Sequence, residues 1–249
     1  MKKLVVLFIL FFLIISCESE PDKITKITAT TNQIDSLLLH DSTVVREYLP
    51  YREKMVEEVN KIISYAPENL VRTDGKLQSS LGNLLADLLY EKANRLFEKE
   101  TGKKVDFSFS NYGGIRAGIW KGDVKVKNAF NLMPFENTIV VAELTSEKVG
   151  ELFEYFLIKN EAHPISKQVQ ITLVNDTPKI LINGKPINHN KTYFVATSDY
   201  LQKGGGDMNF FAAPESLYES NFLVREAIID YFKSKDTLVS RLDNRVVEK

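Results

Sequence analysis

Cysteine and histidine are scarce in this sequence. Cys17 is the only cysteine among 249 residues, so neither an internal disulfide nor a Cys/His catalytic pair is expected. The histidines, His40, His163 and His189, lie far apart without carboxylates at ligand spacing. We therefore expect each to be a solvated or capping histidine rather than a metal ligand. The sequence predicts no metal site and no cofactor in this chain.

The motifs of other common catalytic machineries are also missing. The sequence contains neither the phosphate-binding pattern Gly-x-x-x-x-Gly-Lys-Ser/Thr nor the Gly-x-Ser-x-Gly turn of a nucleophilic serine. Asp106, Asp123 and Glu136 are carboxylates in or beside expected loops, where acidic side chains are usually solvated. We therefore expect no catalytic residue in the chain, which should bind a ligand rather than hydrolyse it.

The chain has little net charge. Its formal charge is -1, and lysines and arginines are scattered rather than gathered in stripes between aromatic residues. This distribution argues against a nucleic-acid binder, whereas a pocket for a free nucleotide needs only local positive charge. With 44% hydrophobic and 26% charged residues, the composition is that of a globular protein with a full core.

The N-terminus has the layout of a bacterial secretory signal. Lys2 and Lys3 precede an unbroken apolar run over residues 4–15. This run is shorter than the roughly 20 residues of a membrane-spanning helix. Ser16 and Cys17 follow, and the context Ile-Ile-Ser-Cys resembles a lipobox, in which the cysteine is lipidated and becomes the new N-terminus. We expect Cys17 to be acylated; the alternative is a plain signal peptide with another cleavage point.

This interpretation divides the chain into three parts. Residues 1–16 are the expected lipoprotein signal peptide, residues 17–35 a polar tether, and residues 36–249 the folded domain. The mature protein would then be lipid-anchored to a membrane of the cell envelope, facing either the periplasm or the outside.

Hydrophobic periodicity predicts a mixture of helices and strands. Helices are expected over residues 41–65, with Pro50 separating a short one from a longer one, and over 77–100, 146–158 and 222–232. Strands are expected over residues 105–109, 138–145 and 193–197, with a hairpin over 168–182. Because this order has no regular βαβ rhythm, we predict a single α+β domain with mixed layers.

Turn-forming segments adjoin the predicted strands at residues 111–116, 133–137 and 198–207. Two of them contain glycine runs, which let the backbone turn tightly and approach a ligand closely. The candidate ligand-binding residues in these segments are Asn111, Arg116, Phe135, Asn137, Tyr200 and Asp207.

The chemistry of these side chains suits a nucleoside or a nucleotide. The two aromatic rings offer flat faces to a base, and the two amides suit its polar edges. The arginine suits phosphate or sugar oxygens, and the aspartate suits vicinal hydroxyls. Each segment alone is also ordinary loop chemistry, since Gly-Gly and Pro-Phe are common between strands. Their combination predicts a substrate-binding pocket.

The same segments belong to a longer ordered pattern. It consists of Leu-Gly-Asn-Leu-Leu-Ala-Asp at residues 81–87, the loop at 111–116, Gly-Asp at 122–123, Pro-Phe-x-Asn-Thr at 134–138, and Asp-Tyr-Leu at 199–201 followed by Gly-Gly-Asp at 205–207. In order and approximate spacing this pattern resembles the C-terminal domain of 5′-nucleotidases, which binds the substrate in that family.

This resemblance implies roles for the candidate residues. Phe135 and Tyr200 would stack on the two faces of the base, and Asp207 would hold the ribose hydroxyls. Arg116 and Asn111 would contact the nucleotide directly. Asn137 matches a position beside the base in some members of the family.

The sequence departs from the family pattern at three places. Family members commonly carry an arginine shortly before Leu-Gly-Asn, where this chain has Leu77, with Arg72 the nearest basic residue. The second glycine loop carries one residue more than usual between Tyr200 and Asp207. A glycine commonly follows the threonine at the position of Thr145, where this chain has serine.

The resemblance implies the substrate-recognition half of an extracytoplasmic 5′-nucleotidase, a hydrolase of nucleotide catabolism. Complete members carry a metallophosphatase domain of which this sequence shows nothing, so we expect a separate metallophosphatase chain as partner, which would hold the divalent metals. Two alternatives remain. One is a nucleoside-binding lipoprotein that captures its ligand for uptake, and the other is a degenerate relative that binds nothing.

Overall fold

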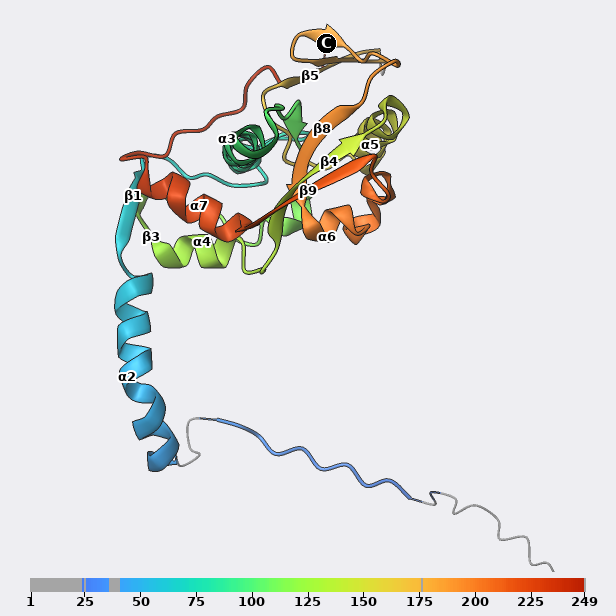
Figure 1. Ribbon diagram of the computed structural model, residues 1–249. Helices are drawn as coiled ribbons and strands as arrows, with labels where there is room; N and C mark the ends of the chain where they lie inside the picture. Colours follow the sequence, from blue (N-terminus) through green and yellow to red (C-terminus); the bar gives the residue numbers. More distant parts are fainter. Residues whose placement is uncertain (1–23, 25, 36–40, 176, 249) are drawn as a thin grey trace, which may run out of the picture. The chain divides into compact units, whose positions relative to one another are not determined.

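The structure, a computed structural model, describes residues 24, 26–35, 41–175 and 177–248 (Figure 1). Contacts divide the chain into two units, Met1–Tyr48 and Leu49–Lys249. Cys17 and the expected signal peptide lie outside the described residues. In the part of the chain that is described, no helix is long and apolar enough to cross a membrane.

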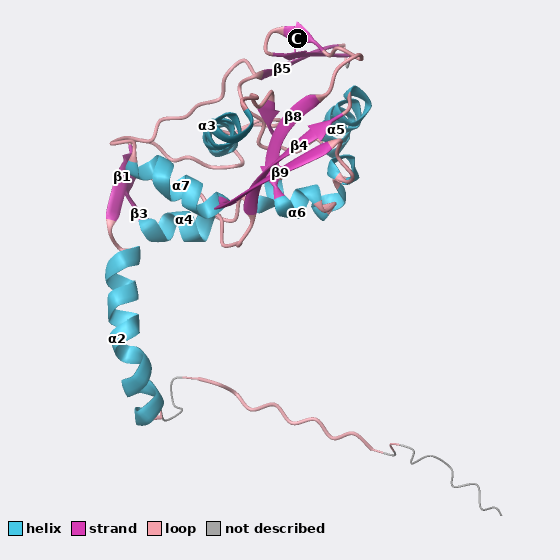
Figure 2. Ribbon diagram, viewed as in Figure 1, coloured by secondary structure: helices cyan, strands magenta, loops and turns pink. Residues whose placement is uncertain are grey.

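Helices and strands alternate along the chain without a regular repeat (Figure 2). The helices are α2 (Ser42–Val59), α3 (Ser80–Thr101), α4 (Val126–Leu132), α5 (Ser146–Lys159), α6 (Asp199–Gln202) and α7 (Val224–Lys233). The strands are β1 (Ile62–Ala66), β2 (Phe107–Ser108), β3 (Gly122–Lys125), β4 (Thr138–Leu144), β5 (Val169–Val174), β6 (Thr177–Ile182), β7 (Lys185–Pro186), β8 (Tyr193–Ser198), β9 (Ser216–Leu223) and β10 (Val246–Glu248). The sheets mix parallel and antiparallel pairs, which confirms the predicted α+β class.

The central sheet has the strand order β2-β8-β4-β9. Strand β2 runs parallel to β8, whereas β4 is antiparallel to both β8 and β9. The C-terminal ends of β2, β8 and β9 therefore meet the start of β4 at one edge of the sheet. At that edge the three turn-forming segments and the start of α7 lie close together, although they are far apart in the sequence.

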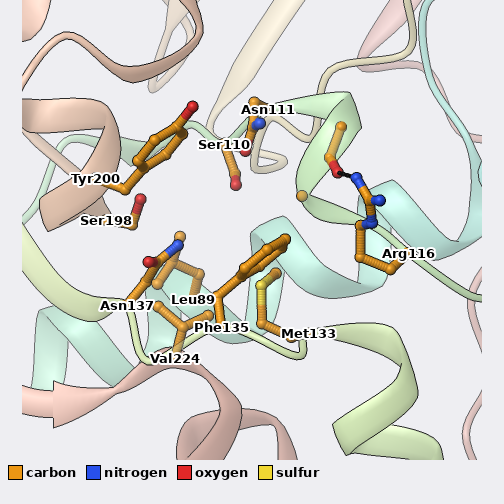
Figure 3. A pocket seen from close by; sticks show the side chains of 12 residues that line it. Leu89, Ser110, Asn111, Arg116, Met133, Phe135, Asn137, Ser198, Tyr200 and Val224 are labelled. Carbon is orange, nitrogen blue, oxygen red and sulfur yellow. Dashed lines mark hydrogen bonds between the residues drawn. The ribbon is translucent and has the colours of Figure 1, made fainter. Parts of the chain in front are cut away.

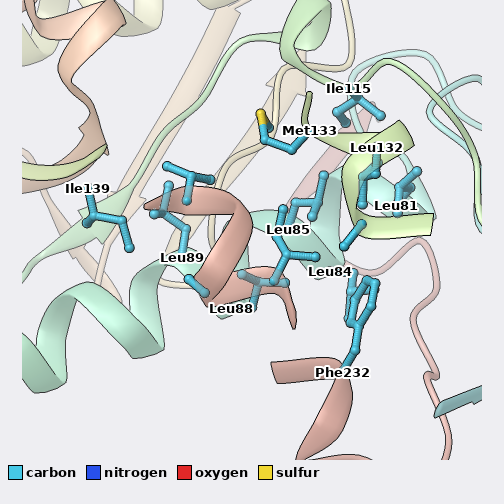
Figure 4. Close-up of a cluster of buried hydrophobic side chains, with 14 of the residues drawn as sticks. Leu81, Leu84, Leu85, Leu88, Leu89, Ile115, Leu132, Met133, Ile139 and Phe232 are labelled. Atoms are coloured by element: carbon cyan, nitrogen blue, oxygen red, sulfur yellow. The ribbon is translucent and has the colours of Figure 1, made fainter. Parts of the chain in front are cut away.

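Buried side chains form two hydrophobic clusters, one on each face of this sheet. Along β4, Ile139 and Val141 belong to the cluster shared with α3 and α7, whereas Ala142 and Leu144 belong to the one shared with α5. Alternate residues of a strand point to opposite faces, which accounts for this division. Figure 4 shows the leucines of α3 in the first cluster, with Phe232 of α7 beside them.

Helix α3 begins at Ser80, three residues after the expected start, and ends at Thr101. The hydroxyl oxygen of Ser79 accepts a hydrogen bond from the Gly82 N–H at 3.0 Å, which caps the first turn. Gly102 ends the helix with φ of 71°, a left-handed conformation that favours glycine. The apolar face of the helix packs in the same cluster as Ile139 and Val141 of β4.

The two smaller sheets extend the domain at its ends. The predicted hairpin forms as β5 and β6, within a sheet of order β10-β5-β6-β7. The tight turn between β6 and β7 has Asn183 and Gly184 at positive φ of 50° and 73°, a conformation that Asn-Gly adopts readily. Strands β1 and β3 form the other sheet.

The prediction for residues 41–65 is partly wrong. One helix, α2, continues through Pro50, and residues that extend the helical pattern instead form β1. Ile62 and Ile63 are β-branched and suit a strand, and β1 finds a partner in β3 from a distant part of the chain. Helix α4 and strand β9 were not predicted either.

Candidate ligand-binding site

A cavity of about 430 Å³ opens at the edge of the central sheet where the three segments meet. Its lining residues are Leu89, Ser110, Asn111, Gly113, Gly114, Arg116, Met133, Phe135, Asn137, Ser198, Tyr200 and Val224 (Figure 3). Five of the six candidate residues are therefore together, and only Asp207 lies elsewhere. The volume is within the range of small-molecule sites.

Phe135 and Tyr200 present aromatic surface to this cavity from two different loops. Figure 3 shows their rings facing the same open space, with Asn111 and Ser110 along another side. The two residues are 37% and 49% exposed, whereas phenylalanines such as Phe107 and Phe153 are fully buried in the core. Rings of this kind can stack on a planar ligand without any core packing being lost.

A close backbone contact fixes the position of the Tyr200 ring. A Cβ atom on Gly205 would lie 2.5 Å from ring carbons of Tyr200, so the ring rests directly on the glycine backbone. The hydroxyl of Tyr155 donates a hydrogen bond to the Gly206 carbonyl at 2.8 Å and holds the same loop. Only glycine at position 205 leaves room for this arrangement.

Arg116 provides the positive charge of the cavity lining. Its guanidinium donates a long hydrogen bond of 3.4 Å to the Gly113 carbonyl and lies 5.9 Å from the centre of the Phe135 ring. Neither contact uses the full set of guanidinium donors, so the group can still bind an anionic ligand. On the same loop, the Asn111 amide packs against Gly114, where a Cβ atom would lie 2.7 Å from its oxygen.

Arg72 supports the loop of residues 111–116 through hydrogen bonds to its backbone. Its guanidinium donates to the carbonyls of Ile115 at 2.6 Å and Tyr112 at 3.2 Å, and it lies over the Tyr112 ring. Leu77, the residue for which the resemblance led us to expect an arginine, is buried in the hydrophobic core. Arg72 thus stabilises the conformation of the loop, and its guanidinium already donates hydrogen bonds to backbone carbonyls.

His163 is buried, contrary to the expectation of a solvated or capping histidine. It is 3% exposed because it fills a space among Phe109, Tyr155 and Phe156. Its Nδ1 accepts a hydrogen bond from the Tyr112 N–H at 3.0 Å, so the ring is a neutral acceptor. Burial, and to a smaller extent Lys159, lowers its pKa to about 4. His189 is exposed, as expected, and His40 lies outside the described residues.

The start of α7 holds the loop that carries Phe135. The Val224 N–H donates to the Asn137 carbonyl at 2.9 Å. The buried guanidinium of Arg225 donates to the Phe135 carbonyl at 3.1 Å, pairs with the Glu136 carboxylate, and lies over the Phe130 ring. Glu136 is therefore part of a support for this loop.

Asp207 lies outside the cavity. It lines a neighbouring hollow with Tyr155 and Phe210. In its loop, Gly204, Gly206 and Asp207 all have positive φ, and it is Gly205 that meets the Tyr200 ring. The Asp207 carboxylate therefore follows a run of glycines that turns it toward the neighbouring hollow rather than toward the cavity.

Some lining residues were not predicted from the sequence. Leu89 and Met133 belong both to the hydrophobic core and to the floor of the cavity, and their pattern is that of ordinary core residues. Ser110 directly precedes the first loop, and Val224 begins α7. Within the described ranges, no group of three or more His, Cys, Asp or Glu side chains could hold a metal ion.

The family model of the 5′-nucleotidase C-terminal domain matches residues 58–213. This chain belongs to that family. The match includes all six candidate residues and the loops of the cavity.

Individual relatives of the 5′-nucleotidase family are much longer than this chain. The trifunctional nucleotide phosphoesterase YfkN of Bacillus subtilis is 30% identical over 187 residues, which are 69% of this chain and 12% of that protein. A 5′-nucleotidase of Vibrio vulnificus is 23% identical over 82% of this chain and 36% of its own length. The crystal structure of a 5′-nucleotidase precursor from Thermus thermophilus has the same fold, with a TM-score of 0.68 and 21% identity over 84% of this chain and 43% of that one. The chain thus spans less than half the length of each of these relatives.

Proposed function

We propose that this protein is the nucleotide- or nucleoside-recognition part of a 5′-nucleotidase. The observation that carries the proposal is the pair of exposed rings, Phe135 and Tyr200, facing one cavity from two loops. Arg116 supplies charge for a phosphate, and Asn111 and Asn137 supply amides for the edges of a base. Membership of the 5′-nucleotidase C-terminal domain family supports the same ligand class.

Asp207 is proposed as the ribose ligand. It lines the neighbouring hollow rather than the cavity, so this role requires the glycine loop to turn toward the ligand. Gly204 and Gly206 can adopt other φ angles, and such a movement would break the hydrogen bond from the Tyr155 hydroxyl to the Gly206 carbonyl.

Phosphate release is proposed to need a metallophosphatase, which we expect to be a separate chain that holds the divalent metals. The support for this division of labour is that the histidines of this sequence are few and dispersed, whereas a two-metal site needs a dense set of ligands. Cys17 is proposed as a lipid anchor to the cell envelope, after removal of residues 1–16. Membrane fractionation of a Cys17→Ser variant tests the anchor, and a variant that keeps a lipid label would contradict it.

Calorimetric titration with nucleosides and nucleoside monophosphates tests the recognition function. The wild type should bind, and Phe135→Ala or Tyr200→Ala should each weaken binding roughly 5- to 150-fold, since one base–aromatic stack is worth about 1–3 kcal/mol. Phe135→Tyr keeps an aromatic face and is the matched control, with little loss expected. Equal heats from the wild type and the double alanine variant would mean that the cavity does not recognise a base.

A further inference from the structure

The rings of Phe135 and Tyr200 can stack on one ligand only if their loops keep a fixed separation. The loops come from different strands, β4 and β8, and each continues for several residues beyond the sheet. The backbone ladder between these two strands ends at the pair Ile139 and Ser198. Something other than the ladder must therefore connect the loops beyond that point.

Asp199 makes this connection. Its Oδ1 accepts a hydrogen bond from the Thr138 N–H at 2.9 Å. Asp199 directly precedes Tyr200, and Thr138 directly follows Asn137, so the bond joins the two loops beside the cavity. Ser198 caps helix α6, which turns the backbone away from the sheet at Asp199. The aspartate side chain thus replaces the backbone acceptor that the ladder would otherwise have supplied.

The Phe135 loop is also held from its other side. Val224 and Arg225 bind the carbonyls of Asn137 and Phe135 from the start of α7. The Asp199 bond therefore connects the Tyr200 loop to a loop that is already fixed. Lys203 lies 3.6 Å from the second oxygen of Asp199, but its side chain is 68% exposed, so this ion pair adds little.

We propose that Asp199 is a positioning residue that sets the gap between the rings of Phe135 and Tyr200. The proposal rests on the recognition function proposed above, and it concerns the geometry of the site rather than a ligand contact. Loss of the bond should leave the Thr138 N–H without its acceptor and let the two loops separate. Ligand binding would then have to order the two rings, and the conformational entropy lost in doing so would lower the affinity.

The chain offers a closely matched control for this test. Asp106 also accepts from a backbone N–H, that of Phe194, at 2.9 Å, and it also pairs with a lysine, Lys191, at 3.1 Å. Asp106 lies away from the residues that line the cavity. Asp106→Ala thus removes the same kind of interaction from the same fold without touching the two loops.

The experiment compares Asp199→Ala, Asp199→Asn and Asp106→Ala in the full chain by amide hydrogen exchange and by calorimetric titration with adenosine. In Asp199→Ala, exchange at Thr138 and in residues 200–204 of the Tyr200 loop should accelerate, and adenosine affinity should fall roughly 10-fold. Asp199→Asn keeps an acceptor oxygen and should restore both properties. Asp106→Ala should change neither, although it also loses stability.

The outcomes separate this proposal from the recognition function. Unchanged exchange in Asp199→Ala would overturn the positioning role whether or not adenosine binds, and so would failure of Asp199→Asn to rescue. An equal loss of affinity in Asp106→Ala would also overturn it, because a general loss of stability would then be the cause. If Asp199→Ala accelerates exchange as expected but the wild type binds neither adenosine nor any nucleotide, only the recognition function is overturned.

Discussion

Asp207 is separated from the other candidate side chains by the conformation of its glycine loop. The residue of this loop that lies against the Tyr200 ring is Gly205. The identity of the aspartate was readable from the sequence, but its position depended on φ angles in a run of glycines, where the sequence imposes few restrictions. The ribose contact therefore stays a prediction.

Discrimination between ribose and 2′-deoxyribose tests this prediction at Asp207. A carboxylate can accept hydrogen bonds from both vicinal hydroxyls of ribose but from only one in the deoxy sugar. The wild type should prefer the ribose ligand, and Asp207→Ala should lose roughly 10-fold in that preference. Glu154→Ala, in the same hollow, is the control and should keep the preference. An unaltered preference in Asp207→Ala, measured by calorimetry, would remove Asp207 from the site.

His163 makes the stability of the domain depend on pH. Its pKa is lowered from 6.5 to about 4, chiefly by burial, so the folded state favours the neutral ring. The groups nearest to it are Lys159, Tyr155 and Glu161, whose carboxylate lies 3.6 Å from Nε2. The stabilisation is complete above pH 6.5 and is lost as the pH falls toward 4, because the unfolded chain then binds a proton that the folded chain excludes.

Urea unfolding at several pH values measures this effect. Between pH 6.5 and 4 the free energy of unfolding should fall by about 3 kcal/mol more in the wild type than in His163→Asn. Asparagine can still accept from the Tyr112 N–H, but it does not titrate. Both proteins carry the same carboxylates, so the difference between their profiles reports on the histidine. Parallel pH profiles would show that His163 is not held neutral.

At the scale of elements, regular periodicity decided what the sequence could predict. Helix α3 has a long apolar face with a cap at each end, and strands β4 and β8 are buried, so both kinds of element were predicted. Strand β9 lies at the edge of the central sheet and exposes much of its length, which leaves little hydrophobic pattern to read. Strand β1 was mistaken for helix because its partner β3 is distant in sequence.

The same distinction applies to the site. The loops could be predicted because they contain glycine, proline and aromatic residues beside predicted strands, a pattern that is visible in the local sequence. The side chains that support the loops could not be predicted in this way, since Asp199, Arg225 and His163 each form a hydrogen bond with a backbone group in a distant segment. Such contacts follow from the strand order of the sheet. A reader of the sequence alone sees only an ordinary aspartate, arginine and histidine.

At the scale of the whole molecule, recognition and hydrolysis are expected to be separate. Hydrolysis by two metals needs a dense set of ligands that fix the ions about 3.5–4 Å apart, and the histidines of this sequence are few and dispersed.

The purified protein should therefore release no phosphate from nucleoside monophosphates above background, with or without added divalent metals. Release should begin when a metallophosphatase partner is added. It should fall sharply when the added protein carries both Phe135→Ala and Tyr200→Ala, because the substrate is then no longer held. A phosphate-release assay decides between the possibilities: metal-dependent release by the wild type alone would disprove the division of labour, whereas tight binding without release in any mixture would favour capture for uptake.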